Sequence, residues 1–109
     1  MTNPIVTRQY MIDNITSRTG DSLVHFVGRA LVVLFERQTQ DEKSDNTTRH
    51  HNGIGFAGND GRSGVLTAKS YLRNRTLQDW QLDKWTRNPN RLAKYHGQLN
   101  EAAMEKAGR

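Results

Sequence analysis

The chain has 109 residues, of which 34% are hydrophobic and 25% are charged, so it can bury one modest core and is too short for two domains. It contains no cysteine, which excludes a disulfide framework, a thiolate zinc site and a thiol nucleophile. The net charge of +5 comes from residues 61–96, where eight Lys and Arg residues stand against Asp79 and Asp83. Such a segment attracts polyanions and is typical of nucleic-acid binding, although a merely solvated basic face has the same composition.

The first ten residues lack the basic start and the apolar core of a signal peptide. No apolar run approaches the length of a membrane span. We therefore expect a cytoplasmic protein, and the absence of cysteine agrees with a reducing compartment.

Two helices are predicted in the first third of the chain. Apolar residues at helical spacing predict a short helix over about 6–17, and Gly20 breaks it. Asp21 or Ser22 can then cap a second helix over about 22–40. Its apolar stripe consists of Leu23, Phe26, Val27, Ala30, Leu31 and Leu34. Because further valines and Phe35 make most of its circumference apolar, we expect this helix to be central.

A polar connector and a glycine-rich loop follow the central helix. Residues 36–51 include no apolar side chain, and five glycines lie between His50 and Gly64. We expect an ordered loop over about 50–61, which Ile54 and Phe56 pin to the core. The residues expected to shape it are Asn52, Gly53, Gly55, Phe56 and Asp60. Glycines there can adopt positive φ, while the Asn and Asp side chains bond to nearby backbone.

The second half of the chain predicts three further helical segments. The first, over about 62–74, places Val65, Ala68, Leu72 and Tyr71 on one face. Thr76 and Asp79 resemble a capping box that opens the next helix. Asn88 and Pro89 then start the last helix, whose stripe includes Leu92, Tyr95 and Leu99 and whose end frays at about 105–109.

The two tryptophans predict how the fourth segment is placed. Trp80 and Trp85 are five residues apart, which puts them about 140° from each other around a helix. One of them should be buried and the other partly exposed. Together these patterns predict an all-α fold, with residues 1–109 forming a single domain of four to five helices around the central one.

No residue set predicts catalysis, a cofactor or a metal. Residues 53–58 match the dinucleotide fingerprint G-x-G-x-x-G, but no buried strand precedes them and no acid follows at the required distance. His50 and His51 are adjacent, so their side chains diverge, and Ser63 lacks the context of a serine nucleophile. We expect a protein that is not an enzyme.

Basic side chains interleaved with aromatic ones form the most credible binding site. Lys69 and Arg73 lie one helical turn apart, and an exposed Trp80 could stack on a base or anchor a protein partner. The residues expected to bind nucleic acid or a partner are Arg62, Lys69, Arg73, Arg75, Trp80, Lys84 and Arg87.

Residues 34–103 resemble a module of bacteriophage and prophage proteins. The resemblance depends on an Asn-Gly-x-Gly-Phe loop and a Lys-Tyr-x-x-Gln-Leu helix, carried here by Asn52, Gly53, Gly55, Phe56, Asp60, Lys94, Tyr95, Gln98 and Leu99. Similar strings form small free-standing phage proteins, mostly without assigned activity, and occur near the ends of some phage helicase or recombination proteins. The resemblance therefore implies a phage source and the cytoplasm of a bacterial host.

Two functions remain open at this point. The first is a phage accessory protein that binds nucleic acid, or a nucleoprotein complex, through the basic face. The alternative is a phage inhibitor of a host protein complex, such as an anti-CRISPR or another host-takeover protein, which acts by protein–protein binding. Small size and the lack of catalytic groups agree with both.

Overall fold

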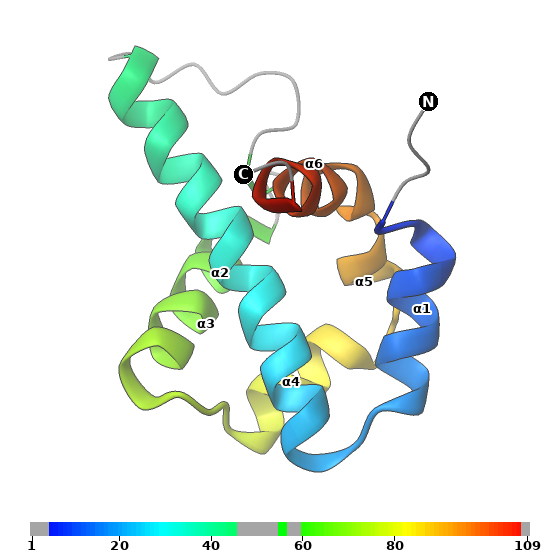
Figure 1. Ribbon diagram of the computed structural model, residues 1–109. Coiled ribbons are helices and arrows are strands. Elements are labelled where there is room, and N and C mark those ends of the chain that lie inside the picture. Colours follow the sequence, from blue (N-terminus) through cyan, green and yellow to red (C-terminus); the bar gives the residue numbers. More distant parts are fainter. Residues whose placement is uncertain (1–4, 46–54, 57–59, 108–109) are drawn as a thin grey trace.

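The computed structural model describes residues 5–45, 55–56 and 60–107 (Figure 1). In this part of the chain there are six helices and no strand, which confirms the all-α prediction. The helices are α1 (Arg8–Ser17), α2 (Gly20–Asp45), α3 (Gly61–Asn74), α4 (Asp79–Thr86), α5 (Asn90–Ala93) and α6 (His96–Ala107). None of the described helices is both long enough and apolar enough to cross a membrane.

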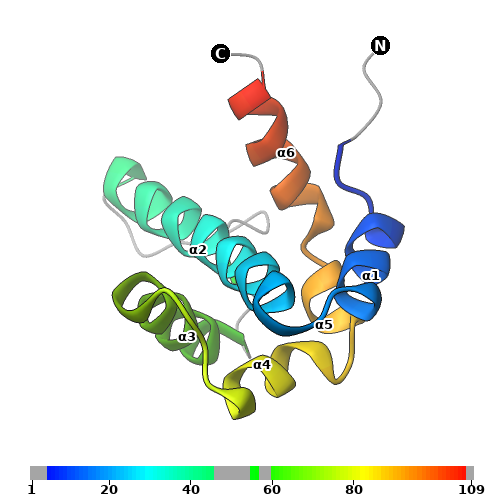
Figure 2. The same cartoon turned by 60° about the horizontal axis from the view of Figure 1, so that its bottom comes forward.

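Helix α2 is the centre of the packing, as its apolar circumference predicts. It contacts α1, α3, α4 and α6, and Val27, Leu31 and Leu34 on it are fully buried. Figures 1 and 2 show α3 along one side of α2, α1, α5 and α6 on the other side, and α4 near the start of α2. The helix is 26 residues long and continues to Asp45. The first part of the polar connector is therefore helical.

Helix α1 is capped at its start by Thr7, whose side chain accepts a hydrogen bond from the backbone N–H of Tyr10 at 3.0 Å. A sharp turn then joins α1 to α2. Gly20 has a φ of +57°, which a glycine adopts without steric cost, and α2 begins there. The predicted caps Asp21 and Ser22 are wrong, because both residues already lie inside the helix.

The buried face of α3 differs from the predicted one. Gly64, Thr67, Ala68 and Tyr71 are buried, whereas Leu72 is 38% exposed. A Cβ atom at Gly28 of α2 would collide with the Tyr71 ring, so α2 and α3 approach closely where one of them has no side chain. The missing side chain of Gly28 therefore makes room for the Tyr71 ring, the smaller residues Gly64, Thr67 and Ala68 complete the buried face, and Leu72 is left on the flank.

The start of α4 also differs from the prediction. The helix begins at Asp79, and the Gln81 side chain accepts a hydrogen bond from the backbone N–H of Gln78 at 2.9 Å. A capping box of two glutamines thus replaces the predicted pair of Thr76 and Asp79. The prediction for the two tryptophans is confirmed, since Trp85 is 0% exposed and Trp80 is 62% exposed.

The predicted last helix is divided in two. Helix α5 ends at Ala93, and α6 begins at His96 after a turn at Lys94 and Tyr95. Leu92 of α5, Tyr95 of the turn and Leu99 of α6 are all buried. Helix α6 extends to Ala107, so residues 105–107, predicted to fray, are helical.

Candidate functional site

The described residues of the glycine-rich loop are bound by two glutamine side chains. The backbone N–H of Gly55 donates to Gln98 Oε1 at 2.7 Å, and Gln98 Nε2 donates to the Gly55 carbonyl at 2.9 Å. The backbone N–H of Phe56 donates to Gln38 Oε1 at 3.1 Å. Side-chain amides of α2 and α6 therefore satisfy backbone groups of the loop that no helix or sheet would satisfy.

Glycine is required at position 55 for two reasons. Its φ is +79°, in the left-handed region that L side chains rarely adopt. A Cβ atom there would also lie 2.5 Å from Cβ of Gln38. The backbone of the loop therefore lies directly against α2.

The Phe56 ring packs among aromatic rings of α4 and the α5–α6 turn. Its centroid lies 6.2 Å from that of Trp85 and 6.0 Å from that of Tyr95, with the Tyr95 ring edge-on. A Cβ atom at Gly64 would be 2.5 Å from the Phe56 ring, so this glycine makes room for it. The loop thus joins α3, α4 and the start of α6 through one side chain.

Asp60 is a buried carboxylate with three described partners. It directly precedes α3 and is 2% exposed. Its Oδ2 accepts a hydrogen bond from the Tyr95 hydroxyl at 2.7 Å and pairs with Lys94 Nζ at 2.7 Å. Its Oδ1 pairs with Arg91 Nη2 at 3.2 Å. The negative charge is thereby compensated by two cations and one hydroxyl.

The environment of Asp60 favours its ionised form. Burial by itself would raise the pKa of this carboxyl group. Hydrogen bonds from Lys94 and Tyr95, and the positive charges of Lys94 and Arg91, outweigh burial and hold the pKa below its usual range. The carboxylate is therefore charged at neutral pH.

We call this set of contacts the clasp, made by Gly55, Phe56 and Asp60 with Gln38, Arg91, Lys94, Tyr95 and Gln98. The described partners of Asp60 are side chains distant in sequence, whereas the sequence predicted nearby backbone. Asn52 and Gly53, also predicted to shape the loop, lie outside the described residues. Six of the nine residues that carry the phage resemblance take part in the clasp, namely Gly55, Phe56, Asp60, Lys94, Tyr95 and Gln98.

The predicted basic residues of α3 form a row on its outer side. Arg62, Lys69 and Arg73 are all exposed and lie within about 40° of one another around the helix, opposite the buried stripe. Lys69 Nζ lies 5.8 Å from the centroid of the Phe35 ring. Arg75 stands just beyond the end of the helix, with a φ of +58°. We call Arg62, Lys69 and Arg73 the outer row.

The predicted residues of α4 border a separate polar hollow of about 790 Å³. Trp80 and Lys84 come from α4, Arg87 directly follows it, and Arg91 and Lys94 come from α5 and the turn after it. The hollow is completed by Asp60, Asp83, Asn88 and Asn90. We call it the basic hollow, because four cationic side chains border it against two carboxylates.

Most of the charged groups of the basic hollow are fixed by contacts. Arg87 pairs with Asp83 one helical turn away. The Arg91 guanidinium lies 4.7 Å from the centroid of the Trp85 ring, in addition to its pair with Asp60. Within the described part of the chain, Lys84 has no acidic partner.

Trp80 stands at the rim of the basic hollow with its ring oriented by one hydrogen bond. Its Nε1–H donates to Gln78 Oε1 at 2.8 Å, and the side chain is 62% exposed. The polar atom of the indole is thus satisfied within the protein, while much of the side chain remains open to solvent. Such a ring can stack on a planar group without losing a hydrogen bond.

The predicted site residues do not include Gln38, Arg91, Lys94 and Gln98, which contact the loop or border the basic hollow. Arg91 and Lys94 contribute to the predicted charge but were not assigned to the binding set, and the roles of Gln38 and Gln98 were not foreseen. Lys94 and Gln98 belong to the Lys-Tyr-x-x-Gln-Leu motif, so the resemblance was the signal that pointed to them. Arg91 and Gln38 carry no such signal, because only the fold brings them to the loop.

The described residues include no group of three or more His, Cys, Asp or Glu side chains placed to hold a metal ion. His25 Nδ1 lies 2.7 Å from the Tyr71 hydroxyl, a contact between α2 and α3. Comparison of the chain with family models, with curated proteins and with solved structures gave no match.

Proposed function

We propose that this protein binds nucleic acid through the basic hollow, with the outer row of α3 as a second set of phosphate contacts. The observation that carries the proposal is the exposed, oriented ring of Trp80 at the edge of a hollow bordered by four cations. Phosphates supply the opposite charge, and unpaired bases supply planar faces for the indole ring. A purely solvated basic surface would have no need for an exposed tryptophan.

The cations of the basic hollow are of two kinds: some are held in place by contacts within the protein, and others are free to move. Arg91 and Lys94 are held by Asp60 in the clasp, so they contribute a positive field of fixed geometry. Lys84 is exposed and can move to meet a phosphate. Because α4, α5 and Asp60 meet here, the position of the field depends on the tertiary fold.

The resemblance to phage modules supplies the biological setting of the proposal. The protein would act as a small phage accessory protein in the cytoplasm of a bacterial host. There it would bind nucleic acid or a nucleoprotein complex and perform no catalysis itself.

Binding of fluorescein-labelled single-stranded and duplex DNA at low salt tests this function. The affinity should fall steeply as salt rises, and Lys84→Glu should weaken it by about tenfold or more, because each phosphate contact contributes to the salt dependence. Arg8→Glu is the matched control, since Arg8 is an exposed residue of α1 outside both basic sites. The absence of any DNA binding at low salt would contradict the proposal.

One observation favours the alternative, inhibition of a host protein complex. Leu66 is exposed in the middle of the outer row, and Leu72 is exposed beside it. Apolar side chains among basic ones are typical of a surface that a protein partner covers. Affinity purification from a bacterial host separates the two functions. A stoichiometric host protein that remains after nuclease treatment and a high-salt wash would favour inhibition, whereas recovery of nucleic acid alone would favour the first proposal.

A further inference from the structure

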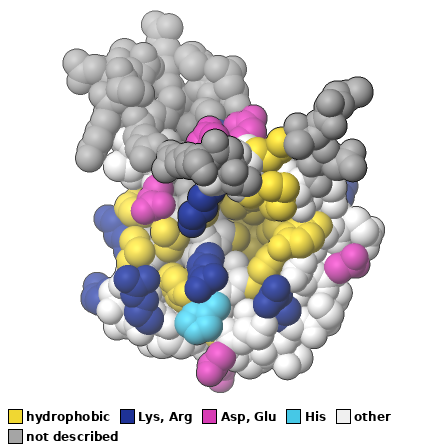
Figure 3. All heavy atoms as spheres, in the orientation of Figure 1, with side chains coloured by type: hydrophobic (Ala, Val, Ile, Leu, Met, Phe, Trp, Pro, Cys, Tyr) yellow, Lys and Arg dark blue, Asp and Glu magenta, His cyan; other side chains and the backbone are white. Residues whose placement is uncertain are grey.

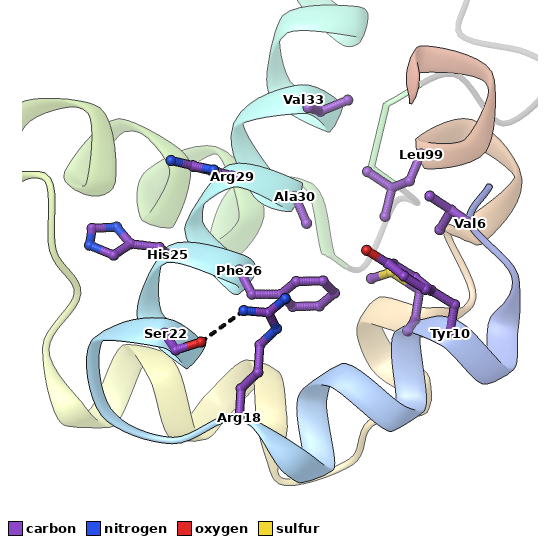
Figure 4. A pocket seen from close by; sticks show the side chains of 11 residues that line it. Val6, Tyr10, Arg18, Ser22, His25, Phe26, Arg29, Ala30, Val33 and Leu99 are labelled. Carbon is purple, nitrogen blue, oxygen red and sulfur yellow. Dashed lines mark hydrogen bonds between the residues drawn. The ribbon is translucent and has the colours of Figure 1, made fainter. Parts of the chain in front are cut away.

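A second surface, which shares no lining residue with the basic hollow, is apolar. A hollow of about 390 Å³ lies between α1 and α2 and is closed at one end by α6. Its apolar floor is made by Val6, Met11, Phe26, Ala30, Val33 and Leu99. In Figure 4 the rings of Tyr10 and Phe26 lie next to each other in it, with centroids 6.3 Å apart and ring planes tilted by 53°. Tyr10 is 40% exposed, so this aromatic pair is open to solvent on one side.

This hollow continues along α2 into a second one. The second hollow, of about 360 Å³, lies between α2 and α6 and shares Val33 and Leu99 with the first. The two together follow α2 from Ser22 to Arg37, which corresponds to about 22 Å at the rise of an α-helix. We call the combined feature the apolar groove. Figure 3 shows hydrophobic side chains gathered along it, between α2 and the side formed by α1 and α6.

The charges around the first part of the apolar groove have one sign. Its charged lining residues are Arg18 and Arg29, and none of its described lining residues is acidic. The Arg18 guanidinium lies 5.2 Å from the centroid of the Phe26 ring and donates a hydrogen bond to Ser22 Oγ at 2.8 Å. Arg29 is exposed and has no acidic partner within the described residues. A ligand in the first part meets an apolar floor and positive charge, whereas the charged side chains that line the second part, Glu36, Arg37, Glu105 and Lys106, have both signs.

We infer that the apolar groove binds an amphipathic α-helix of a partner protein that carries acidic side chains beside its apolar stripe. The length of the groove along α2 fits about four helical turns. An apolar stripe at steps of three and four residues would cover Val33, Phe26 and Tyr10, which is the recognition mode of a helix in a groove. The acidic side chains would pair with Arg29 and Arg18, which have no carboxylate partner among the described residues. Nucleic acid fits this groove poorly, because it would leave the apolar floor uncovered.

Two synthetic peptides test this inference with the full-length chain. Both are helical 14-residue peptides with the same apolar stripe, and they differ only in Glu or Lys at the flanking positions. Fluorescence anisotropy at low salt should show the Glu peptide binding at least tenfold more tightly than the Lys peptide. Arg29→Glu should remove or reverse this preference, and Val33→Asp should weaken the binding of both peptides.

Matched variants separate the groove from the general positive charge of the chain. Arg8→Glu changes the net charge by the same amount outside the groove, so it should leave the preference for the Glu peptide in place. Circular dichroism and thermal melting confirm that each variant is folded. Equal binding of the two peptides, no saturable binding of either, or an equal effect of Arg8→Glu and Arg29→Glu would overturn the inference.

Two further measurements test other occupants of the groove. Sedimentation equilibrium that shows a dimer, dissociated by Val33→Asp, would place a second copy of the chain in the groove and overturn the inference. Competition between an oligonucleotide and the Glu peptide that Arg29→Glu abolishes, but Lys84→Glu does not, would assign the groove to nucleic acid and likewise overturn it. A monomer whose Glu-peptide binding persists in the presence of DNA supports it.

Discussion

The Tyr95 hydroxyl donates a hydrogen bond to the Asp60 carboxylate at 2.7 Å, which joins residues that are 35 positions apart in the sequence. The same carboxylate holds Arg91 and Lys94, two of the cations that border the basic hollow. The clasp that anchors the loop and the surface proposed to bind nucleic acid therefore share one buried charge. Changes at Asp60 should affect both stability and binding.

The ionisation of Asp60 predicts how stability depends on pH. The folded protein holds its pKa below the ordinary value of 3.8, so ionised Asp60 stabilises the fold at every pH above that value. The stabilisation is lost as pH falls below 3.8 and through the lower pKa of the folded state, because the unfolded chain then binds the proton more readily. Urea unfolding at a series of pH values should show this loss. Its slope below pH 3.8 should be smaller in Asp60→Asn.

Asp60→Asn should also destabilise the protein at neutral pH. The change leaves Arg91 and Lys94 without their carboxylate, and removal of one partner from a buried pair costs about 3 to 5 kcal/mol. We expect the lower end, about 3 kcal/mol, because both cations are partly exposed and can turn toward water. Tyr95→Phe, which removes only the hydroxyl, should cost about 1 to 3 kcal/mol in the same urea titration. A larger loss in Tyr95→Phe than in Asp60→Asn would contradict the central role of the carboxylate.

Phe56→Ala should lower the free energy of unfolding by about 3 kcal/mol. The ring packs against Trp85 and Tyr95, and large-to-small changes of aromatic core residues cost about 3 to 5 kcal/mol. The lower end applies because Phe56 is only partly buried. Thermal melting checks this expectation. A variant that melts like the parent protein but no longer binds its partner would show that the loop is a recognition element instead.

Gly55→Ala should destabilise the protein more than Gly20→Ala does. Both glycines have positive φ, so each substitution carries the left-handed penalty of roughly 1 to 2 kcal/mol. At Gly20 a Cβ atom would meet nothing within 4 Å, whereas at Gly55 it would lie 2.5 Å from Gln38. The difference between the two melting temperatures measures the contact of the loop with α2. Equal effects would mean that the loop moves away from α2 at little cost.

Trp80 offers a direct optical test of base stacking. The chain has two tryptophans, and Trp85 is fully buried, so quenching of the emission by a single-stranded oligonucleotide should come from Trp80. Trp80→Phe should remove this quenching, and Trp80→Ala should weaken binding by about 1 to 3 kcal/mol for one stacked base. The salt dependence should not change in either variant, because no charge is removed. If Trp80→Ala binds the oligonucleotide as tightly as the parent protein, base stacking does not contribute to binding and phosphate contacts alone account for it.

The sequence by itself determined the helical architecture and its centre. The apolar stripe from Leu23 to Leu34 repeats at the period of a helix and covers most of the circumference, and this local pattern is enough to predict that α2 is central. The five-residue spacing of Trp80 and Trp85 likewise placed them on different sides of α4. These predictions succeed because helical periodicity depends on residues a few positions apart.

The tertiary structure decided which residues meet across the fold. Gly28 sets how closely α2 and α3 approach, and for this reason Tyr71 is buried and Leu72 is not. The pairs of Asp60 with Arg91 and Lys94, and of Gly55 with Gln98, join segments separated by the whole of α3 and α4. The hydrophobic periodicity of the sequence cannot predict such contacts, because they depend on how helices pack and not on the spacing of residues within one helix. The basic hollow follows from the same packing, because only the packing brings its basic residues together on one surface.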